Sequence, residues 1–165
     1  MSTEIERKYL VVGDAWRRKA TSKSHIVQGY LARGRRSTIR VRIKDDKAAT
    51  LTIKSRERGV SRSEFEYRIG LKDARALLEL CGSSRIEKDR YTVPQGKLTW
   101  EIDVFLSPVE LTMAEVELES ADEEVKLPKW IGEDVTDDPD YRNSSLADSG
   151  EITRSPADQT VRTTG

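Results

Sequence analysis

The 165-residue chain has one cysteine and one histidine, and these scarcities exclude several kinds of site. With Cys81 alone, the chain cannot form an internal disulfide, a thiolate zinc cluster or a CxxC redox pair. A single His25 has no histidine partners for a metal site, and such a residue is more often incidental. We therefore expect Cys81 to pack in a core and His25 to take no part in chemistry.

Net charge and long apolar runs are missing as well. The 29 Lys and Arg residues balance the 29 Asp and Glu residues, whereas domains that bind nucleic acid or anionic membranes tend to be basic. No apolar run approaches the ~20 residues that span a bilayer, and the first residues lack the pattern of a signal peptide. We expect a cytoplasmic protein with no nucleic-acid and no membrane partner.

The chain is rich in charged residues, and many of them alternate with apolar residues along the sequence. Charged residues make up 35% of the sequence, against roughly 25% in typical soluble domains. Alternating charged and apolar residues predict strands over residues 4–12, 25–32, 37–44, 49–55, 61–69, 85–93, 98–105 and 112–120. Helical patterns cover residues 14–20, 71–81, 121–127 and 141–147. We predict one domain over residues 1–147 and a disordered C-terminal tail over residues 148–165.

Two architectures explain this alternation. An ordinary antiparallel sheet would place its apolar face on a core and its charged face in water. The second architecture is mainly β within the α+β class: an eight-stranded antiparallel barrel with its charged face inward and its apolar face covered by helices. The segregation of charge favours the second, because the acidic pairs Glu4/Glu6, Glu64/Glu66, Glu101/Asp103 and Glu115/Glu117 stand on different strands from Arg40/Arg42, Lys54 and Lys88/Arg90.

A lumen of this kind would select its ligand by charge. The basic strands call for a polyanion, and the acidic strands would repel one unless a hard cation came with it. Ligand sets made only of oxygen suit Mg²⁺ or Mn²⁺. A triphosphate or polyphosphate bound to metal meets both requirements.

The order of these charged residues along the chain resembles that of a known family. The string Glu4-Ile5-Glu6-Arg7-Lys8 is similar to the ExExK signature of the CYTH superfamily, the triphosphate tunnel metalloenzymes. The resemblance continues in order through Arg40-Val41-Arg42, Lys54, Glu64-Phe65-Glu66, Lys88-Asp89-Arg90, Asp103 and Glu115-Val116-Glu117. It implies an antiparallel β tunnel that acts on triphosphates with a divalent metal. The compact length resembles the short bacterial branch, whose members are often inorganic triphosphatases.

The resemblance also implies roles for individual residues. The expected metal ligands are Glu4, Glu6, Glu115 and Glu117. The expected phosphate-binding residues are Lys8, Arg40, Arg42, Lys54, Lys88 and Arg90, and the expected catalytic set is Lys8, Lys88, Glu64 and Asp103. Surface glutamates and cross-strand salt bridges are the plain alternatives for these residues. Glu64 and Asp103 could orient the basic residues, hold a second metal or assist a water molecule.

We therefore expect metal-dependent hydrolysis of inorganic triphosphate, with Mg²⁺ or Mn²⁺ as cofactor and a small-molecule triphosphate as substrate. An adenylate cyclase, a thiamine triphosphatase or a nucleoside triphosphatase would use the same residues, but aromatics make up only 6% of the chain. A polyphosphate- or nucleotide-binding module without catalysis is the alternative from another class. The sequence leaves a homodimer open.

Overall fold

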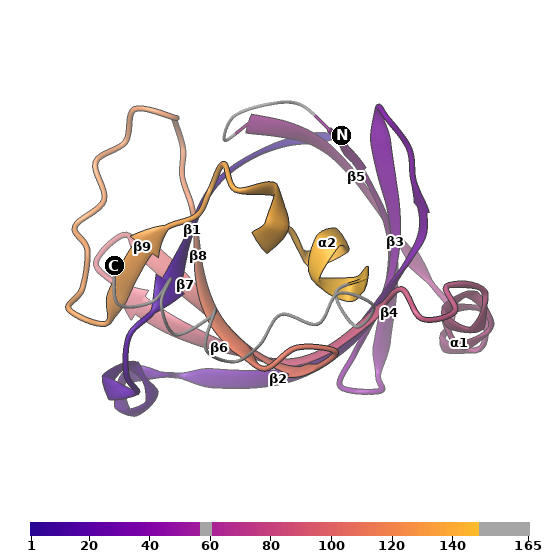
Figure 1. Ribbon diagram of the computed structural model, residues 1–165, viewed down its shortest axis with the longest axis horizontal. Coiled ribbons are helices and arrows are strands. Elements are labelled where there is room, and N and C mark those ends of the chain that lie inside the picture. The colour runs from indigo at the N-terminus through magenta and orange to yellow at the C-terminus, as the bar shows by residue number, and fades with distance from the viewer. Residues whose placement is uncertain (57–60, 149–165) are drawn as a thin grey trace.

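The predicted strands form one antiparallel sheet that closes on itself (Figure 1). The computed structural model describes residues 1–56 and 61–148. The ring consists of β1 (Ser2–Val11), β2 (Ser22–Arg33), β3 (Ser37–Lys44), β4 (Ala48–Ser55), β5 (Ser61–Ile69), β6 (Arg85–Gln95), β7 (Leu98–Ser107) and β8 (Leu111–Glu117). Around the ring the order is β5-β4-β3-β2-β6-β7-β8-β1, and β5 pairs with β1 to close it. The prediction of an eight-stranded, mainly β barrel is confirmed.

The closing joint between β1 and β5 is short. Residues 2–5 of β1 pair with residues 61–64 of β5, after which β1 pairs with β8 from Glu6 onward. A ninth strand, β9 (Ile131–Asp134), pairs with the far end of β1. β1 therefore contacts three other strands and holds the two sides of the ring together.

The helices follow the predicted pattern in part. The apolar stripe of residues 71–81 forms α1 (Leu71–Leu80), and the predicted last helix forms the 3₁₀ turn η2 (Pro139–Tyr141) followed by α2 (Asn143–Asp148). Residues 14–20 form only the 3₁₀ turn η1 (Ala15–Lys19), and Asp14 makes no capping hydrogen bond through its side chain. No helix of the described part of the chain is long and apolar enough to cross a membrane.

The predicted helix over residues 121–127 is wrong, because the segment has no helical structure. Most of it is exposed, and Val125 is its only member packed against the core. A short helix depends on a buried face for its stability, and one apolar contact does not supply it. The predicted disordered tail begins with Asp148, which ends α2, and its residues 149–165 lie outside the described residues.

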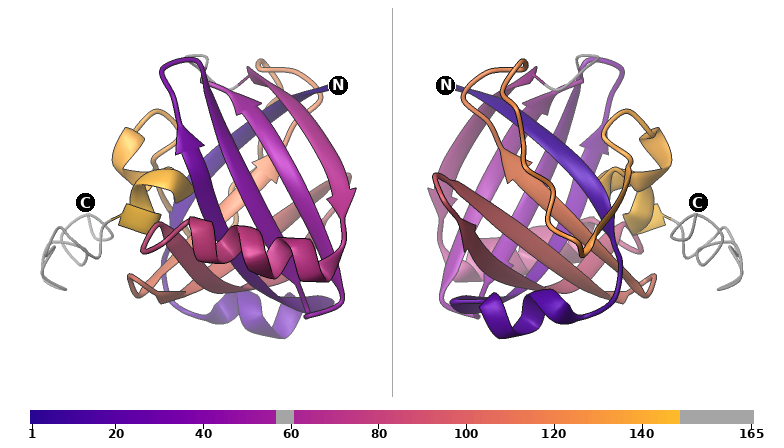
Figure 2. Two further views of the ribbon diagram at one scale, coloured as in Figure 1. Left: turned by 90° about the vertical axis from the view of Figure 1, so that its right-hand side faces the viewer. Right: turned by 90° about the vertical axis from the view of Figure 1, so that its left-hand side faces the viewer.

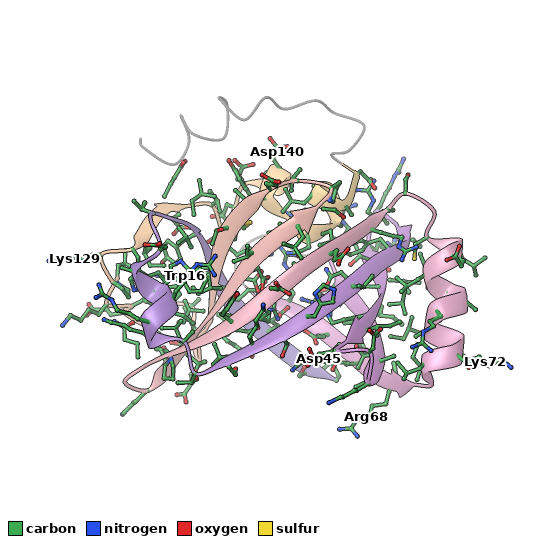
Figure 3. The ribbon with its side chains drawn as sticks, turned by 90° about the horizontal axis from the view of Figure 1, so that it is seen from below. Trp16, Asp45, Arg68, Lys72, Lys129 and Asp140 are labelled. Carbon is green, nitrogen blue, oxygen red and sulfur yellow. The ribbon has the colours of Figure 1, made fainter. Side chains whose placement is uncertain are left out.

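The apolar phase of the strands forms two cores beneath the outer elements. Figure 2 shows α1 lying against the outside of the barrel. On one side α1 covers β2, β3 and β4, where Cys81 comes so close to Gly29 that a Cβ there would lie 2.6 Å from the Cys81 sulfur. On the other side Trp16 of η1 (Figure 3) is buried in a cluster with Trp100 and Trp130. Cys81 is buried, as predicted.

A third cluster lies around the C-terminal segment and was not predicted. Leu10 and Met113, paired across β1 and β8 two positions beyond Lys8 and Glu115, pack with Leu146 of α2. Cross-strand neighbours share a face of the sheet, so these residues belong to the same inward phase as the charges. Figure 1 shows η2 and α2 lying across the opening of the ring. The barrel interior is therefore apolar in one part and charged in the other.

Candidate active site

The charged part of the interior encloses a cavity of about 210 Å³. Drug-sized ligands occupy pockets of ≈ 300–1,000 Å³, so this cavity favours a compact ligand. All but one of the residues predicted for the site line this cavity. The lining ones are Glu4, Glu6, Lys8, Arg40, Arg42, Lys54, Glu64, Lys88, Arg90, Glu115 and Glu117. The exception, Asp103, lies behind the lining with 1% of its surface exposed.

Asp103 organises the wall formed by β6 and β7. Its Oδ2 accepts a hydrogen bond of 2.7 Å from Lys88 Nζ, and its two oxygens accept bonds of 2.7 and 2.9 Å from the Arg90 guanidinium. Arg90 and Asp103 are direct partners across the two strands, which places both on the inner face. We call Lys8, Lys88 and Arg90, with the carboxylates that they contact, the paired wall.

The charges of the paired wall shift one another's pKa. Burial opposes ionisation of Asp103, but Arg90 and Lys88 outweigh it and hold the pKa of Asp103 well below its usual range. Burial likewise opposes the charge of Arg90, and Asp103 outweighs it, so the pKa of Arg90 lies well above its ordinary value. Lys88 is different. Lys88 is fully buried, and this burial lowers its pKa. Asp103 opposes the shift, but the positive charges of Arg90 and Arg42 add to it, so the pKa of Lys88 falls to about 7.

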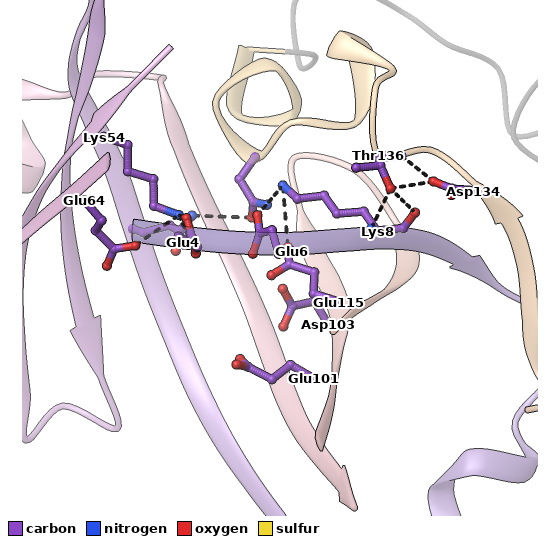
Figure 4. Close-up of polar contacts among 12 residues, drawn as sticks. Glu4, Glu6, Lys8, Lys54, Glu64, Glu101, Asp103, Glu115, Asp134 and Thr136 are labelled. Carbon is purple, nitrogen blue, oxygen red and sulfur yellow. Dashed lines mark hydrogen bonds and ion pairs between the residues drawn. The ribbon is translucent and has the colours of Figure 1, made fainter. Parts of the chain in front are cut away.

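Lys8 and Lys54 stand among the glutamates (Figure 4). Lys8 Nζ lies 3.6 Å from a carboxylate oxygen of Glu6 and 3.6 Å from one of Glu115. Burial opposes its charge, but these two carboxylates prevail and raise the pKa of Lys8. Lys54 Nζ lies 2.8 Å from Glu4 Oε2 and 3.8 Å from Glu64. The predicted alternative of cross-strand ion pairs is thus present in the cavity.

A second wall, on β3, which β2 separates from β6, carries arginines without carboxylate partners among the described residues. Arg40 Nη2 donates to the hydroxyl of Thr52 at 3.2 Å, and its Nε is buried with no hydrogen-bond partner in the part of the chain that the structure describes. Arg42 Nε donates to the side-chain oxygen of Gln28 at 2.9 Å. Burial and the neighbouring charges of Arg40 and Arg90 lower the pKa of Arg42 to about 9. We call Arg40 and Arg42 the arginine wall, which presents positive charge with neutral partners only.

The predicted metal ligands are all carboxylates, but the described residues do not bring them together as a metal site. Glu6 and Glu117 are direct partners across β1 and β8, and Lys8 stands opposite Glu115 on the same two strands. Carboxylate oxygen is the donor that Mg²⁺ and Mn²⁺ prefer, so the residues fit such an ion. Within residues 1–56 and 61–148, no three acidic, histidine or cysteine side chains stand close enough to hold a metal. Lys8 Nζ, at 3.6 Å from Glu6 and 3.6 Å from Glu115, provides the positive charge beside these carboxylates.

Sequence reasoning missed several residues of the site. Asn143, the first residue of α2, accepts a hydrogen bond of 2.8 Å from Lys88 Nζ. Gln28 supports Arg42, and Arg62 and Arg142 line the cavity. Arg62 could have been found, since it shares the phase of Glu64 on β5. Asn143 and Arg142 had no signal, because only the folded C-terminal segment brings them to the cavity.

His25 lies apart from the cavity, in an ion cluster with two carboxylates. Its ring nitrogens lie 2.9 Å from Asp89 Oδ1 and 3.0 Å from Glu87 Oε1. Asp89 and Glu87 alternate along β6 with Lys88, which points into the cavity, so the cluster belongs to the outer face. The structure gives His25 no contact with the predicted site.

Comparisons with known proteins agree with this geometry. The model of the CYTH domain family matches residues 2–148. A relative from Acetivibrio thermocellus, named inorganic triphosphatase, is 43% identical over 149 residues, which cover 88% of this chain and 94% of the relative. Another of the same name, from Nitrosomonas europaea, is 38% identical over 154 residues, covering 88% and 97%. The crystal structure of the inorganic triphosphatase NE1496 has a TM-score of 0.62 at 32% identity, covering 87% of this chain and 97% of that chain.

Proposed function

This chain belongs to the CYTH domain family, and on that premise we propose that it is a divalent-metal-dependent hydrolase of inorganic triphosphate. The observation that carries the proposal is the arginine wall, where Arg40 and Arg42 face the cavity and have only neutral partners within residues 1–56 and 61–148. Buried charge without a counter-ion is costly, and a polyanion in the cavity would supply one. The names of the two relatives support the same substrate.

The basic residues would hold the phosphate chain. Arg40 and Arg42 offer planar guanidinium groups that match phosphate oxygens in pairs, whereas Lys8 and Lys54 act as point charges. Arg90 is fixed by Asp103 through two hydrogen bonds, so its remaining donors approach the substrate in a set orientation. As negative charge develops on the transferred phosphoryl group, these fixed cations stabilise it without reorganising.

Glu4, Glu6, Glu115 and Glu117 would hold the metal, Mg²⁺ or Mn²⁺. When bound, the ion neutralises phosphate oxygens and polarises the bond to be broken. For the glutamates to converge, Lys8 and Lys54 must release them. The substrate provides the reason, because its oxygens offer both ammonium groups a stronger partner. Glu64 would then remain beside Lys54 to orient it.

Lys88 has the properties of a general base near neutral pH. A neutral amine has two N–H donors and one lone pair, and the two acceptors of Lys88, Asp103 and Asn143, account for both donors. The lone pair is then left to accept a proton. With a pKa of about 7, Lys88 would take that proton from the water that attacks phosphorus as the bridging P–O bond breaks. Asp103 positions the amine and stabilises the ammonium that forms.

Nucleotides and thiamine triphosphate are weaker candidates. Their organic groups need an apolar or aromatic surface, and among the described residues that line the cavity Tyr30 is the only aromatic one. Tyr30 itself is buried, and its hydroxyl accepts a hydrogen bond from Gln28 at 3.1 Å. The lining therefore favours a substrate that consists of phosphate alone.

The test is phosphate release from triphosphate, pyrophosphate, ATP and thiamine triphosphate with Mg²⁺, Mn²⁺ or EDTA. We expect triphosphate to be the best substrate and EDTA to abolish turnover. Glu6→Gln and Glu117→Gln should each lower kcat by more than about 100-fold with an unchanged circular dichroism spectrum. The matched control is Glu79→Gln on α1, whose side chain is 82% exposed. Tight binding of triphosphate without hydrolysis in the wild-type protein would instead identify a binding module.

A further inference from the structure

Lys8 lies between two pairings along the edge of β1 that faces away from β8. On this edge β5 pairs with β1 as far as Ile5, and the register with β9 begins at Tyr9. An irregularity in the register follows directly, between Tyr9 and Val11. Irregularities of this kind occur next to active sites, where they re-aim a side chain or end a pairing. The backbone of Lys8 therefore needs partners other than a regular strand on this edge.

The residues that follow β9 supply these partners. The backbone oxygen of Lys8 accepts a hydrogen bond of 2.9 Å from the backbone nitrogen of Val135. The backbone N–H of Lys8 donates to the hydroxyl oxygen of Thr136 at 3.1 Å (Figure 4). Each backbone N–H within a packed sheet needs an acceptor. At Lys8 this acceptor is a side chain, so the position of the strand depends on one hydroxyl group.

Asp134 determines how this hydroxyl is oriented. Its Oδ1 accepts hydrogen bonds from the backbone N–H of Thr136 at 2.9 Å and from the Thr136 hydroxyl at 2.5 Å. A hydroxyl has one proton to donate and two lone pairs. The distance from the hydroxyl to the backbone oxygen of Lys8 is longer, at 3.4 Å, so the proton points to Asp134. A lone pair then faces the Lys8 N–H, and the two hydrogen bonds polarise each other.

The side chain of Lys8 depends on its backbone more than the side chains of Lys54 and Lys88 do. Its Nζ contacts Glu6 and Glu115 at 3.6 Å each, which is beyond the length of a hydrogen bond. Lys54 and Lys88 approach their nearest carboxylate oxygens to 2.8 and 2.7 Å. Two carboxylates at equal distance attract the ammonium of Lys8 without fixing it. The position of β1 therefore sets where this ammonium stands.

We propose that Thr136 is a positioning residue for Lys8 and that Asp134 holds the Thr136 hydroxyl in the required orientation. Neither residue lines the cavity in the part of the chain that the structure describes. They act on the backbone of Lys8 from the edge of β1 and thereby set the distance from its ammonium to the substrate. The inference rests on the proposed function, because Lys8 is one of the residues that would contact the phosphate chain.

The experiment compares Thr136→Val, which keeps the branched shape and removes the hydroxyl, with Thr136→Ser, which keeps the hydroxyl. Misplacing a catalytic group by about 1 Å can lower a rate by about 100-fold. A smaller displacement is expected here, so Thr136→Val should lower kcat/KM on triphosphate by about tenfold, whereas Thr136→Ser should stay near the wild type. The matched control is Thr21→Val, which removes a hydroxyl bonded to the backbone oxygen of Thr92 on β6. This control should match the wild type.

A double-mutant cycle with Lys8→Met shows whether the effect passes through Lys8. The dissociation constant of triphosphate is measured by calorimetry in EDTA, so that metal-dependent turnover does not interfere. Thr136→Val should raise this constant by about threefold when Lys8 is present and leave it unchanged in Lys8→Met. A residue that only stabilises the barrel would change both backgrounds equally. Equal changes, including none in either background, would overturn the proposal, and so would a Thr136→Ser variant as impaired as Thr136→Val.

These measurements also separate the inference from the proposed function. A wild-type protein that binds triphosphate without hydrolysing it would remove the triphosphatase, while the cycle of dissociation constants would still test Thr136. If binding without metal is too weak to measure, the same cycle is read from kcat/KM. Melting temperatures verify that each variant folds. If Thr136→Val does not fold, Asp134→Ala takes its place, because Asp134 is exposed and its loss frees the hydroxyl to turn away from the Lys8 N–H. We then expect the same dependence on Lys8, with a change of about twofold.

Discussion

The two walls of the cavity use the same kinds of residue for different purposes. On the paired wall, Lys88 and Arg90 are each bonded to the buried carboxylate of Asp103. On the arginine wall, Arg40 and Arg42 have hydrogen bonds to Thr52 and Gln28 alone among the described residues. Charges that are compensated inside the chain fix the geometry of the site, whereas charges left uncompensated create the demand for a ligand. Substitutions on the two walls should therefore separate stability from binding.

The largest effect is expected for the centre of the paired wall. Asp103→Asn removes the carboxylate from two buried cations, and breaking a buried pair in this way costs about 3–5 kcal/mol. We expect the free energy of unfolding, measured in urea, to fall by about that amount. Glu101→Gln removes a partner of Arg90 whose side chain is 40% exposed, and it should cost less than about 1 kcal/mol. Equal losses would mean that Asp103 is not the anchor of the wall.

The arginine wall should give the opposite result. Arg42→Met removes a charge whose partner is neutral, so the free energy of unfolding should stay the same or rise by about 1 kcal/mol. The KM for triphosphate should rise by about 100-fold, because a charge-assisted contact with the substrate is lost. Steady-state kinetics and urea unfolding on the same protein test both statements. A destabilised variant with an unchanged KM would assign Arg42 to the fold instead of the ligand.

A smaller effect is expected where the C-terminal segment meets the paired wall. Asn143→Asp places a carboxylate 2.8 Å from Lys88 Nζ, which favours the ammonium form and raises the pKa of Lys88. Since the base acts in its neutral form, the wild-type kcat/KM should rise with pH to a plateau above about pH 7. In the variant this rise should move up by about one pH unit, with about fivefold lower activity at pH 7.

The uncharged variant Asn143→Ala provides the comparison for that experiment. It removes the same amide without adding a charge, so its pH profile should lie closer to that of the wild type. If both variants shift the profile equally, the shift comes from loss of the amide and not from electrostatics. If neither shifts it, Lys88 does not govern the pH dependence.

The smallest effect is expected for His25, which lies outside both walls. The hydrogen bond that the His25 ring donates to Asp89 and the charge of Glu87, with a lesser contribution from Asp46, raise the pKa of His25 from 6.5. The protonated ring is therefore favoured in the folded protein. Its contribution is complete below about pH 6.5 and is lost as the pH rises through the folded-state pKa. Half-exposed ion pairs contribute little to stability. We therefore expect the difference in melting temperature between the wild type and His25→Gln, measured at several pH values, to decrease slightly as the pH rises through this range.

The sequence predicted the barrel and most of the cavity for a simple physical reason. Side chains alternate between the two faces along each strand, and the charged phase of β1, β3 and β8 contains Lys8, Arg42 and Glu115. Closure of the sheet brings this charged face inside. Residues whose position depends on the packing of other segments could not be read in this way. Asn143 and Arg142 reach the cavity only because η2 and α2 dock on Leu10 and Met113.

The same limit explains two other differences. The inward phase turns apolar at Leu10 and Met113, since the C-terminal segment covers it there, and alternation alone does not reveal which inward positions are covered. The failed helix over residues 121–127 shows the reverse case, because a local pattern was present but the fold offers it almost no surface to bury. The arrangement of the glutamates around Lys8 and Lys54 was also beyond the sequence, since it depends on which partner each ammonium chooses.

The short joint between β1 and β5 makes the first strand a clasp. Glu4 lies within the four paired residues of this joint, and Lys54 reaches it from β4 while also contacting Glu64 of β5. Fastening the ring and assembling the acidic side chains are consequently one event. A ligand that reorganises Glu4 and Lys54 must change how firmly the clasp is held, and amide hydrogen exchange at residues 2–5 would record its arrival.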